Sequence, residues 1–275
     1  MTIRNGDAGS RTVTSGNARF TYLEQGSGTP LVLLHGVGSA ARSWKHQLDA
    51  LSATFRVVAW DAPGYGDSSV LPQEKPDAGD FAAALEVFLA AVGVERFHLV
   101  GHSFGCITAA RFARLHPERI LTLTLASVAG GHAQLAADER ERLRKARLDD
   151  LAELGPRGMA EKRAPRLLGP HADEATKRAV IETMAIVRPD GYTRAVWMLS
   201  GADTRADVRQ LPKDLRTQII YGDADVITTP EQNQSVARER PGVPVHVLPA
   251  GGHAVYLEQP AAFNEILLRF LRQKT

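Results

Sequence analysis

The sequence predicts an α/β domain with a mostly parallel sheet of about eight strands, helices on both faces of the sheet, and a helical cap inserted into the chain. Short apolar runs alternate with helical patterns over most of the sequence, which is the order of elements in α/β domains. The runs are apolar at consecutive positions, as expected of parallel strands that helices cover on both faces. Between residues 130 and 205 this alternation stops, and charged helical segments replace it.

These observations divide the chain into two parts. Residues 1–129 and 206–275 are predicted to form one core domain, and residues 130–205 are predicted to form the cap. The chain has 275 residues, of which 44% are hydrophobic, so it is long enough to bury a sizeable core.

The first elements are expected to be a hairpin followed by a buried strand. Extended runs at Thr12–Ser15 and Arg19–Gln25 flank Gly16-Asn17, a pair that tolerates the positive φ of a tight turn. Strands and helices then alternate. The predicted strands are Leu31–Leu34, Arg56–Trp60, Phe97–Val100 and Ile120–Ala126, and the predicted helices are Ala40–Leu51, Asp80–Val92 and Ser103–Leu115.

The cap is expected to contain an amphipathic helix around Asp138–Asp150. Leucines at 135, 143, 148 and 151 supply its apolar side, and we interpret the dense charges as a solvated face. After the cap the alternation resumes. The remaining elements are strands at Gln218–Tyr221 and Val245–Leu248, a helix from about Pro230, and a last helix from about Pro260 to Leu271.

Composition excludes some classes of partner. The formal net charge is +2, from 33 basic and 31 acidic residues, which gives no field that favours nucleic acid or anionic lipid. The longest apolar stretch, Phe81–Val94, is interrupted by Glu86 and Gly93 and is too short to span a bilayer. We expect no nucleic-acid or membrane partner, and a monomer or a homo-oligomer.

The single cysteine and the polar N-terminus both indicate a cytoplasmic location. Cys106 cannot form an intrachain disulfide or a cysteine-based zinc site, and it is interpreted as a small buried residue. Residues 1–17 contain no apolar segment of the kind that a secretory signal requires.

Ser103 is the candidate nucleophile. It lies in Gly101-His102-Ser103-Phe104-Gly105, where a predicted strand meets a predicted helix, which is the context of a nucleophile elbow. The tight turn forces the serine into a strained conformation, and side chains two residues away on either side would collide with neighbouring backbone. The two glycines meet that requirement.

A serine hydroxyl needs a histidine base, and the histidine needs a carboxylate to orient it. Both partners should follow later strands, because ligands bind at the carboxyl ends of parallel strands. His253 follows Gly251-Gly252 after the strand that ends at Leu248. Asp223 and Asp225 both follow the strand that ends at Tyr221, and one of them could simply cap the turn.

An oxyanion in this type of site requires two backbone N–H donors. One comes from the residue after the nucleophile and one from the loop after an earlier strand, so Phe104 and Val37 are the candidates.

Five segments occur in a fixed order along the chain: His35-Gly36-Val37-Gly38, residues 61–68 (Asp-Ala-Pro-Gly-Tyr-Gly-Asp-Ser), residues 101–105, residues 222–225 and Gly252-His253. Together they resemble the motif set of the α/β-hydrolase fold family over about residues 19–272. The closing stretch, His253–Asn264, is similar to 3-oxoadipate enol-lactonases and related small ester hydrolases. The resemblance implies an α/β-hydrolase fold, a serine hydrolase, Val37 as an oxyanion donor, Asp225 as the triad acid, and no metal or other cofactor.

The expected substrate is a small ester, lactone or diketone, and the cap is expected to select it. Arg188 and Arg194 lie near Trp197, so one of these arginines is a candidate to meet a substrate carboxylate. Trp44 is a candidate for the pocket wall, although its helical spacing from Leu48 also fits a core position.

Three other functions stay open at this point. Carbon–carbon bond hydrolases that act on ring-cleavage products use the same three catalytic residues as esterases. A hydrolase fold can also act as a small-molecule receptor. Finally, residues 36–41 (Gly-Val-Gly-Ser-Ala-Ala) fit a dinucleotide-binding fingerprint, with Asp61 in the place of a ribose-binding acid.

Overall fold

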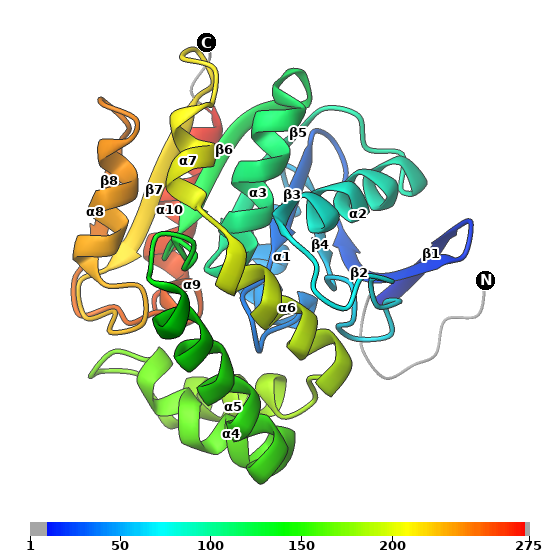
Figure 1. The fold of residues 1–275 in the computed structure, drawn as a ribbon. Coiled ribbons are helices and arrows are strands. Elements are labelled where there is room, and N and C mark those ends of the chain that lie inside the picture. Colours follow the sequence, from blue (N-terminus) through cyan, green and yellow to red (C-terminus); the bar gives the residue numbers. More distant parts are fainter. Residues whose placement is uncertain (1–9, 273–275) are drawn as a thin grey trace.

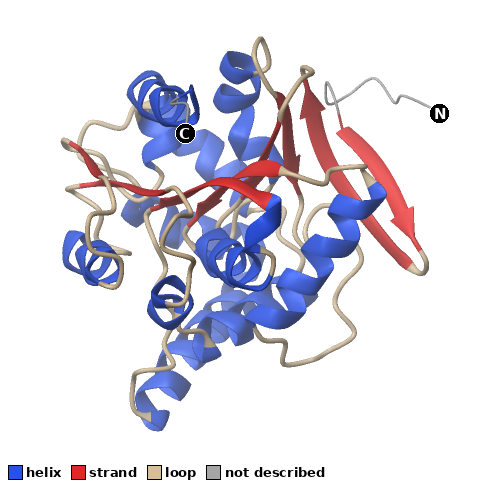
Figure 2. Ribbon diagram, turned by 90° about the horizontal axis from the view of Figure 1, so that it is seen from above, coloured by secondary structure: helices blue, strands red, loops and turns tan. Residues whose placement is uncertain are grey.

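The computed structural model describes residues 10–272 as an eight-stranded sheet with helices on both of its faces (Figure 1, Figure 2). The predicted fold class is therefore confirmed. The strands are β1 (Ser10–Ser15), β2 (Ala18–Gln25), β3 (Pro30–Leu34), β4 (Arg56–Trp60), β5 (Phe97–His102), β6 (Ile120–Ala126), β7 (Thr217–Gly222) and β8 (Val245–Leu248).

The strand order is β1-β2-β4-β3-β5-β6-β7-β8. Strands β4, β3, β5, β6, β7 and β8 pair in parallel, and β2 pairs antiparallel with both β1 and β4. The predicted hairpin is present at β1 and β2, and Gly16 has the positive φ, 57°, that its turn requires.

Helices cover the sheet because its central strands are apolar on both faces. In β3, Leu31 and Leu33 pack in one core with α1 (Lys45–Leu51) and α10 (Pro260–Arg272). Val32 and Leu34 of the same strand belong to the opposite core. That second core includes side chains from α2 (Ala78–Ala91), α3 (Phe104–Leu115) and α8 (Pro230–Arg238).

Capping residues define where several helices begin. Asp77 accepts hydrogen bonds from the N–H groups of Gly79 and Asp80, and the Asp80 side chain reciprocates, so α2 starts earlier than predicted. The helix predicted over Ala40–Leu51 is instead a 3₁₀ turn, Ala41–Trp44, followed by α1. Ala40 is extended there, because the Asp61 carboxylate binds the N–H of Ala41 at 2.8 Å.

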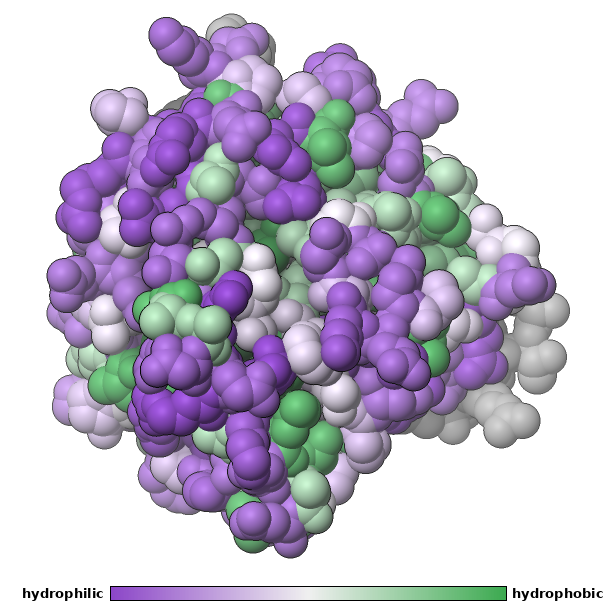
Figure 3. Space-filling view, in the orientation of Figure 1, coloured by the Kyte–Doolittle hydropathy of each residue, from purple (hydrophilic) through white to green (hydrophobic). Residues whose placement is uncertain are grey.

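Between β6 and β7, the described chain forms helices and loops without strands, and this segment includes residues 130–205, the stretch that the sequence predicts to be a cap. Helix α4 contains the expected amphipathic segment and runs much further, with a break at Gly155 (φ 64°, ψ 176°) before Pro156. The surface over α4 is mainly hydrophilic, with small apolar patches (Figure 3). The elements are α4 (Ala137–Arg163), a 3₁₀ turn (Ala164–Leu167), α5 (Glu174–Met184), α6 (Pro189–Gly201) and the start of α7 (Thr204–Arg209).

The predicted boundary at residue 205 falls inside α7, a helix that packs on the core. Its Asp207 accepts two hydrogen bonds from Arg111 of α3, at 2.9 and 3.0 Å. Nowhere in residues 10–272 does a helix combine the length and apolar character that crossing a membrane would need.

Candidate active site

Ser103 occupies a strained turn between β5 and α3. Its φ of 52° and ψ of −115° lie in a region that side chains other than glycine rarely adopt. The turn is held on both sides, since the Ser103 N–H donates to Ala126 of β6 at 2.9 Å and the Cys106 N–H donates to the Ser103 carbonyl at 2.9 Å. The positive end of the α3 dipole therefore lies directly at the serine.

The two flanking glycines are required sterically. A side chain at Gly101 would collide with the backbone of Gly105, and one at Gly105 would collide with the carbonyl of Leu34 in β3. This confirms the steric reason given for the glycines from the sequence.

Asp225 and His253 come from two loops that lie in direct backbone contact. A side chain at Gly222 would collide with the backbone of Gly251, and the Ala224 N–H donates to the Gly251 carbonyl at 2.9 Å. This contact brings His253 Nδ1 to 2.9 Å from Asp225 Oδ2, with both side chains buried. Since a carboxylate only accepts, Nδ1 carries the proton and Nε2 is left with a free lone pair.

The structure distinguishes the two candidate acids. Asp223 does not contact His253; its Oδ1 accepts a hydrogen bond from the Ala250 N–H at 2.6 Å and so links the two loops. Asp225 instead faces the histidine from the same loop.

Thr228 is a site residue that the sequence reasoning missed. Its hydroxyl donates to Asp225 Oδ2 at 2.7 Å and lies 3.2 Å from His253 Nδ1, while Asp225 Oδ1 accepts the N–H groups of Ile227 and Thr228. The available signal was the Asp-x-x-Thr spacing, because aspartate commonly binds backbone N–H groups two and three residues ahead.

These hydrogen bonds keep Asp225 ionised. Burial alone would raise the pKa of Asp225, but the hydrogen bond and charge of His253, together with the Thr228 hydroxyl, outweigh burial and lower that pKa.

His102 positions the histidine loop rather than acting as a base. Its Nε2 lies 2.8 Å from the His253 carbonyl, which can only accept, so Nε2 carries the proton. Burial and the neighbouring His253 lower the pKa of His102 to about 3, so this ring is neutral at ordinary pH.

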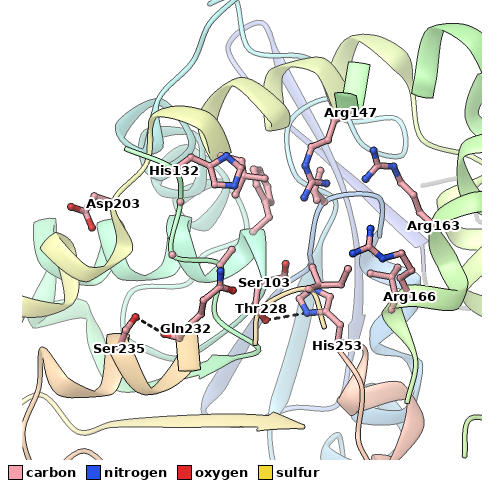
Figure 4. Close-up of a pocket in the computed structure, with 18 of the residues that line it drawn as sticks. Ser103, His132, Arg147, Arg163, Arg166, Asp203, Thr228, Gln232, Ser235 and His253 are labelled. Carbon is pink, nitrogen blue, oxygen red and sulfur yellow. Dashed lines mark hydrogen bonds between the residues drawn. The ribbon is translucent and has the colours of Figure 1, made fainter. Parts of the chain in front are cut away.

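Ser103 and His253 line one cavity of about 240 Å³ beneath the cap, together with Val37 and Phe104 (Figure 4). Apolar residues of the cap, among them Met184 and Leu199, complete part of its wall. The cavity is suited to a small molecule.

The loop that carries Val37 is anchored by a buried histidine. The Ala62 N–H donates to His35 Nε2 at 3.0 Å, and His35 Nδ1 lies 2.8 Å from the Gly36 carbonyl. The ring therefore ties the loop after β3, which carries Val37, to the segment after β4.

Neither Arg188 nor Arg194 lines the cavity, so their assignment to a substrate carboxylate is wrong. Arg188 Nη1 donates to the carbonyl of Ser68 at 2.9 Å, and Arg194 Nε donates to that of Leu71 at 2.8 Å. Both arginines clamp α6 onto the loop after β4, because this helix lies against the core there.

The two tryptophans also lie outside the cavity, which corrects both predictions. Trp44 is fully buried in the core that side chains of α1 and α10 share, with its ring centroid 4.3 Å from that of Tyr256, so the core interpretation of its spacing holds. Trp197 of α6 lies under the guanidinium of Arg144, whose central carbon is 3.7 Å from the ring centroid.

The dinucleotide alternative loses its structural basis. Gly36 packs against the side chains of His102 and Ser103, and Gly38 packs against Met184 of the cap, so this loop borders the serine cavity. The Asp61 carboxylate is also occupied, because it accepts hydrogen bonds from Thr21 Oγ1 and the Ala41 N–H at 2.8 Å each.

Four arginines that line the cavity were not predicted, and one of them is Arg205 of α7. Arg147 and Arg163 of α4 and Arg166 of the following 3₁₀ turn point into the cavity from the cap (Figure 4). Arg147 lies in the charged segment that we interpreted as a solvated face, and that interpretation is wrong for this residue. Within residues 10–272, no cluster of three or more histidine, cysteine or acidic side chains is arranged to hold a metal ion.

Comparison with curated proteins gives two similar relatives that align over most of this chain. A putative carbamate hydrolase, RutD, from Azorhizobium caulinodans is 29% identical over 265 residues, covering 93% of this chain and 96% of that protein. A dihydrolipoyllysine-residue acetyltransferase component of the acetoin cleaving system from Pseudomonas putida is also 29% identical, over 262 residues and 93% of this chain. The chain spans 66% of the length of the latter, just under two thirds.

Comparison with solved structures gives a thermophilic esterase from Thermogutta terrifontis with a TM-score of 0.85 and 25% identity, covering 96% of this chain and 98% of the esterase. The family model described as "Alpha/beta hydrolase family" matches residues 31–266. The chain therefore belongs to the alpha/beta hydrolase family and is a hydrolase.

Proposed function

We propose that this hydrolase cleaves a small carboxylic ester or lactone through a covalent acyl-enzyme on Ser103. One observation carries the proposal: His253 is hydrogen-bonded to Asp225 at 2.9 Å and lines the same cavity as the strained Ser103. The relatives support the reaction class, because an esterase and a carbamate hydrolase both act at a carbonyl bonded to a heteroatom.

In the first half-reaction, Ser103 Oγ attacks the substrate carbonyl carbon while His253 Nε2 takes the hydroxyl proton. The carbonyl oxygen becomes an oxyanion, for which the N–H groups of Val37 and Phe104 are the proposed donors. The carbon–oxygen bond to the leaving group then breaks, and His253 returns the proton to that oxygen. In a lactone the leaving oxygen stays attached to the acyl group.

In the second half-reaction, His253 takes a proton from water, and the resulting hydroxide attacks the acyl-enzyme carbonyl. The bond to Ser103 breaks, Ser103 Oγ regains its proton from His253, and the carboxylic acid leaves. Asp225 stays ionised throughout and stabilises the protonated ring. No step requires a metal or an organic cofactor.

The test is activity and covalent labelling of Ser103→Ala. We expect a loss of at least about 10³-fold in kcat with p-nitrophenyl esters, and no labelling by a fluorophosphonate. The matched control is Ser235→Ala, because Ser235 lines the same cavity and its hydroxyl donates only to the Gln232 carbonyl at 2.7 Å. Full esterase activity in Ser103→Ala would contradict the proposal.

The same catalytic set supports a carbon–carbon bond hydrolase as the alternative, and a small-molecule receptor as the nonenzymatic one. Measuring kcat/KM for esters, lactones and a vinylogous diketone ring-cleavage product separates these functions. A diketone that exceeds every ester would establish the alternative, and tight binding of one ligand without turnover would establish a receptor. We further propose that the enzyme acts in the cytoplasm, since its one cysteine is buried and forms no disulfide.

A further inference from the structure

The cap side of the cavity carries a concentration of positive charge. Arg147, Arg163 and Arg166 point into the cavity from one side, and Asp203 lies on the opposite side with His132 (Figure 4). The reaction on Ser103 uses none of these arginines.

The break in α4 brings Arg147 and Arg163 to the same cavity. Arg147 and Arg163 are 16 residues apart, so in a straight helix they would be separated by about 24 Å along the axis. At Gly155 and Pro156 the chain turns back instead, and Arg163 and Lys162 reach Asp150 of the first half of the helix. Both arginines can therefore line one cavity of about 240 Å³.

Most charged side chains around the cavity already have partners. Arg163 is paired with Asp150, and Arg205 with Glu239 at 2.9 Å. Asp203 caps α7 by accepting the Ala206 N–H at 3.1 Å. Arg163 and Arg205 therefore each have a carboxylate partner within the protein, whereas the Asp203 carboxylate is held by the neutral N–H groups of Ala206 and Gln134.

Arg147 and Arg166 differ from these side chains because they have no partner in the described structure. Within the described part of the chain, neither guanidinium forms an ion pair or a hydrogen bond with the protein. Arg147 is half-buried, and its charge adds to burial in lowering the pKa of His132 across the cavity. A partly buried guanidinium without a counterion is costly, so an anion in the cavity would offset that cost for Arg147. Arg166 is exposed and adds a second positive charge that lines the cavity.

We propose that Arg147 and Arg166 bind a carboxylate of the substrate, so that the preferred substrate is a small ester or lactone carrying a second, ionised carboxyl group. This inference rests on the proposed function of Ser103 and names the substrate class of that site. Arg163 supports the pair, because Asp150 holds its guanidinium in place beside them. A planar guanidinium fork matches the two oxygens of a carboxylate, which favours this anion.

The kinetic test compares matched anionic and neutral esters. One pair is mono-4-nitrophenyl glutarate and its methyl ester, with the charge in the acyl part. The other is 4-carboxyphenyl pentanoate and its methyl ester, with the charge in the leaving group. We expect the wild-type enzyme to prefer the anionic member of at least one pair by kcat/KM.

In Arg147→Gln and Arg166→Gln, the anionic-to-neutral ratio of kcat/KM should fall about 10- to 100-fold, the range for losing a hydrogen bond to a charged group. The matched control is Arg142→Gln, an exposed arginine on the same helix that pairs with Glu139 at 2.6 Å. That control should leave the ratio unchanged. No anionic preference in either pair, or an equal fall in the control, would overturn the proposal.

A binding measurement separates this inference from the proposed function. Glutarate should bind to Ser103→Ala by calorimetry, and adding Arg147→Gln should weaken that binding at least tenfold. If every ester is inert and Ser103 is not labelled, yet glutarate binding still depends on Arg147, the proposed function fails and the anion site stands. If esters are hydrolysed but Arg147→Gln leaves the affinity for glutarate unchanged, the proposed anion site is wrong and the proposed function stands. Tighter binding of inorganic phosphate than of glutarate would overturn the assignment to a carboxylate.

Discussion

The carboxylate of Glu258 joins the cap to the loop that carries His253, because the Gly169 N–H of the cap donates to Glu258 Oε2 at 2.6 Å. The other oxygen of Glu258 accepts the N–H of Gly252, the residue before His253, at 3.1 Å. Burial raises the pKa of Glu258, but the two N–H groups oppose that rise. The position of His253 therefore depends on a side chain that also holds the cap.

Glu258→Gln tests this dependence. Glutamine has one acceptor oxygen, so one of the two N–H groups loses its partner, at a cost of about 1–2 kcal/mol. We expect kcat to fall about tenfold and the midpoint of urea unfolding to decrease. The control is Glu265→Gln on α10, where an exposed ion pair with Arg269 contributes less than about 0.5 kcal/mol. Equal effects of the two substitutions would contradict the role of Glu258.

Asp225→Asn and Asp223→Asn form a second matched pair. At position 225, asparagine removes the charge that holds the His253 tautomer, so kcat should fall on the order of 10³-fold. At position 223, asparagine can still accept the Ala250 N–H, so kcat should change only a few-fold. Steady-state kinetics with one p-nitrophenyl ester measures kcat for both variants. A larger loss of kcat in Asp223→Asn than in Asp225→Asn would make Asp223 the acid that orients His253.

Stability should fall on acidification because of buried histidines far from the site. Burial, with the nearby charge of Arg216, lowers the pKa of His98 to about 4. The folded state therefore resists protonation where the unfolded chain, with a pKa near 6.5, accepts it. The stability that neutral His98 contributes is present above about pH 6.5 and is lost as the pH falls toward 4.

From this shift, His98 alone should account for about 2 kcal/mol of lost stability between pH 6.5 and pH 5. Urea unfolding of His98→Gln should show a correspondingly flatter dependence on pH over that interval. The exposed His171→Gln provides the control. An unchanged slope in His98→Gln would show that His98 does not titrate as described.

Gly105→Ala should destabilise the fold, because the methyl group on α3 would collide with the Leu34 carbonyl at the end of β3. We expect a loss of about 3 kcal/mol or failure to fold. Gly130→Ala is the matched control, since no atom lies within 4 Å of the position its methyl group would take. Its unfolding free energy should stay within about 0.5 kcal/mol of the wild type.

The core strands and the loops that carry Ser103, Asp225 and His253 could be located from the sequence because local patterns determine them. Runs such as Leu31–Leu34 are apolar at every position, which only a strand buried on both faces requires. Ser103 and His253 each follow such a run beside glycines, so their approximate location followed from the topology of a parallel sheet.

The cap side of the cavity could not be predicted in the same way. Which face Arg147 presents depends on the break at Gly155 and on what α4 packs against, and neither is encoded in helical periodicity. Arg188 and Arg194 were chosen for their nearness to Trp197 in the sequence, but α6 turns them toward the loop after β4. Their backbone partners are more than 100 residues away in the chain.

That loop and α6 also touch through two glycines, because a side chain at Gly64 or Gly191 would collide with the other's backbone. Together with the hydrogen bonds of Arg188 and Arg194, this contact fixes α6 to the loop after β4. Opening the whole cap as one body would break this glycine contact and both arginine hydrogen bonds. Opening that leaves α6 in place would instead move α4 and α5, the helices that carry Arg147 and Met184 of the cavity wall.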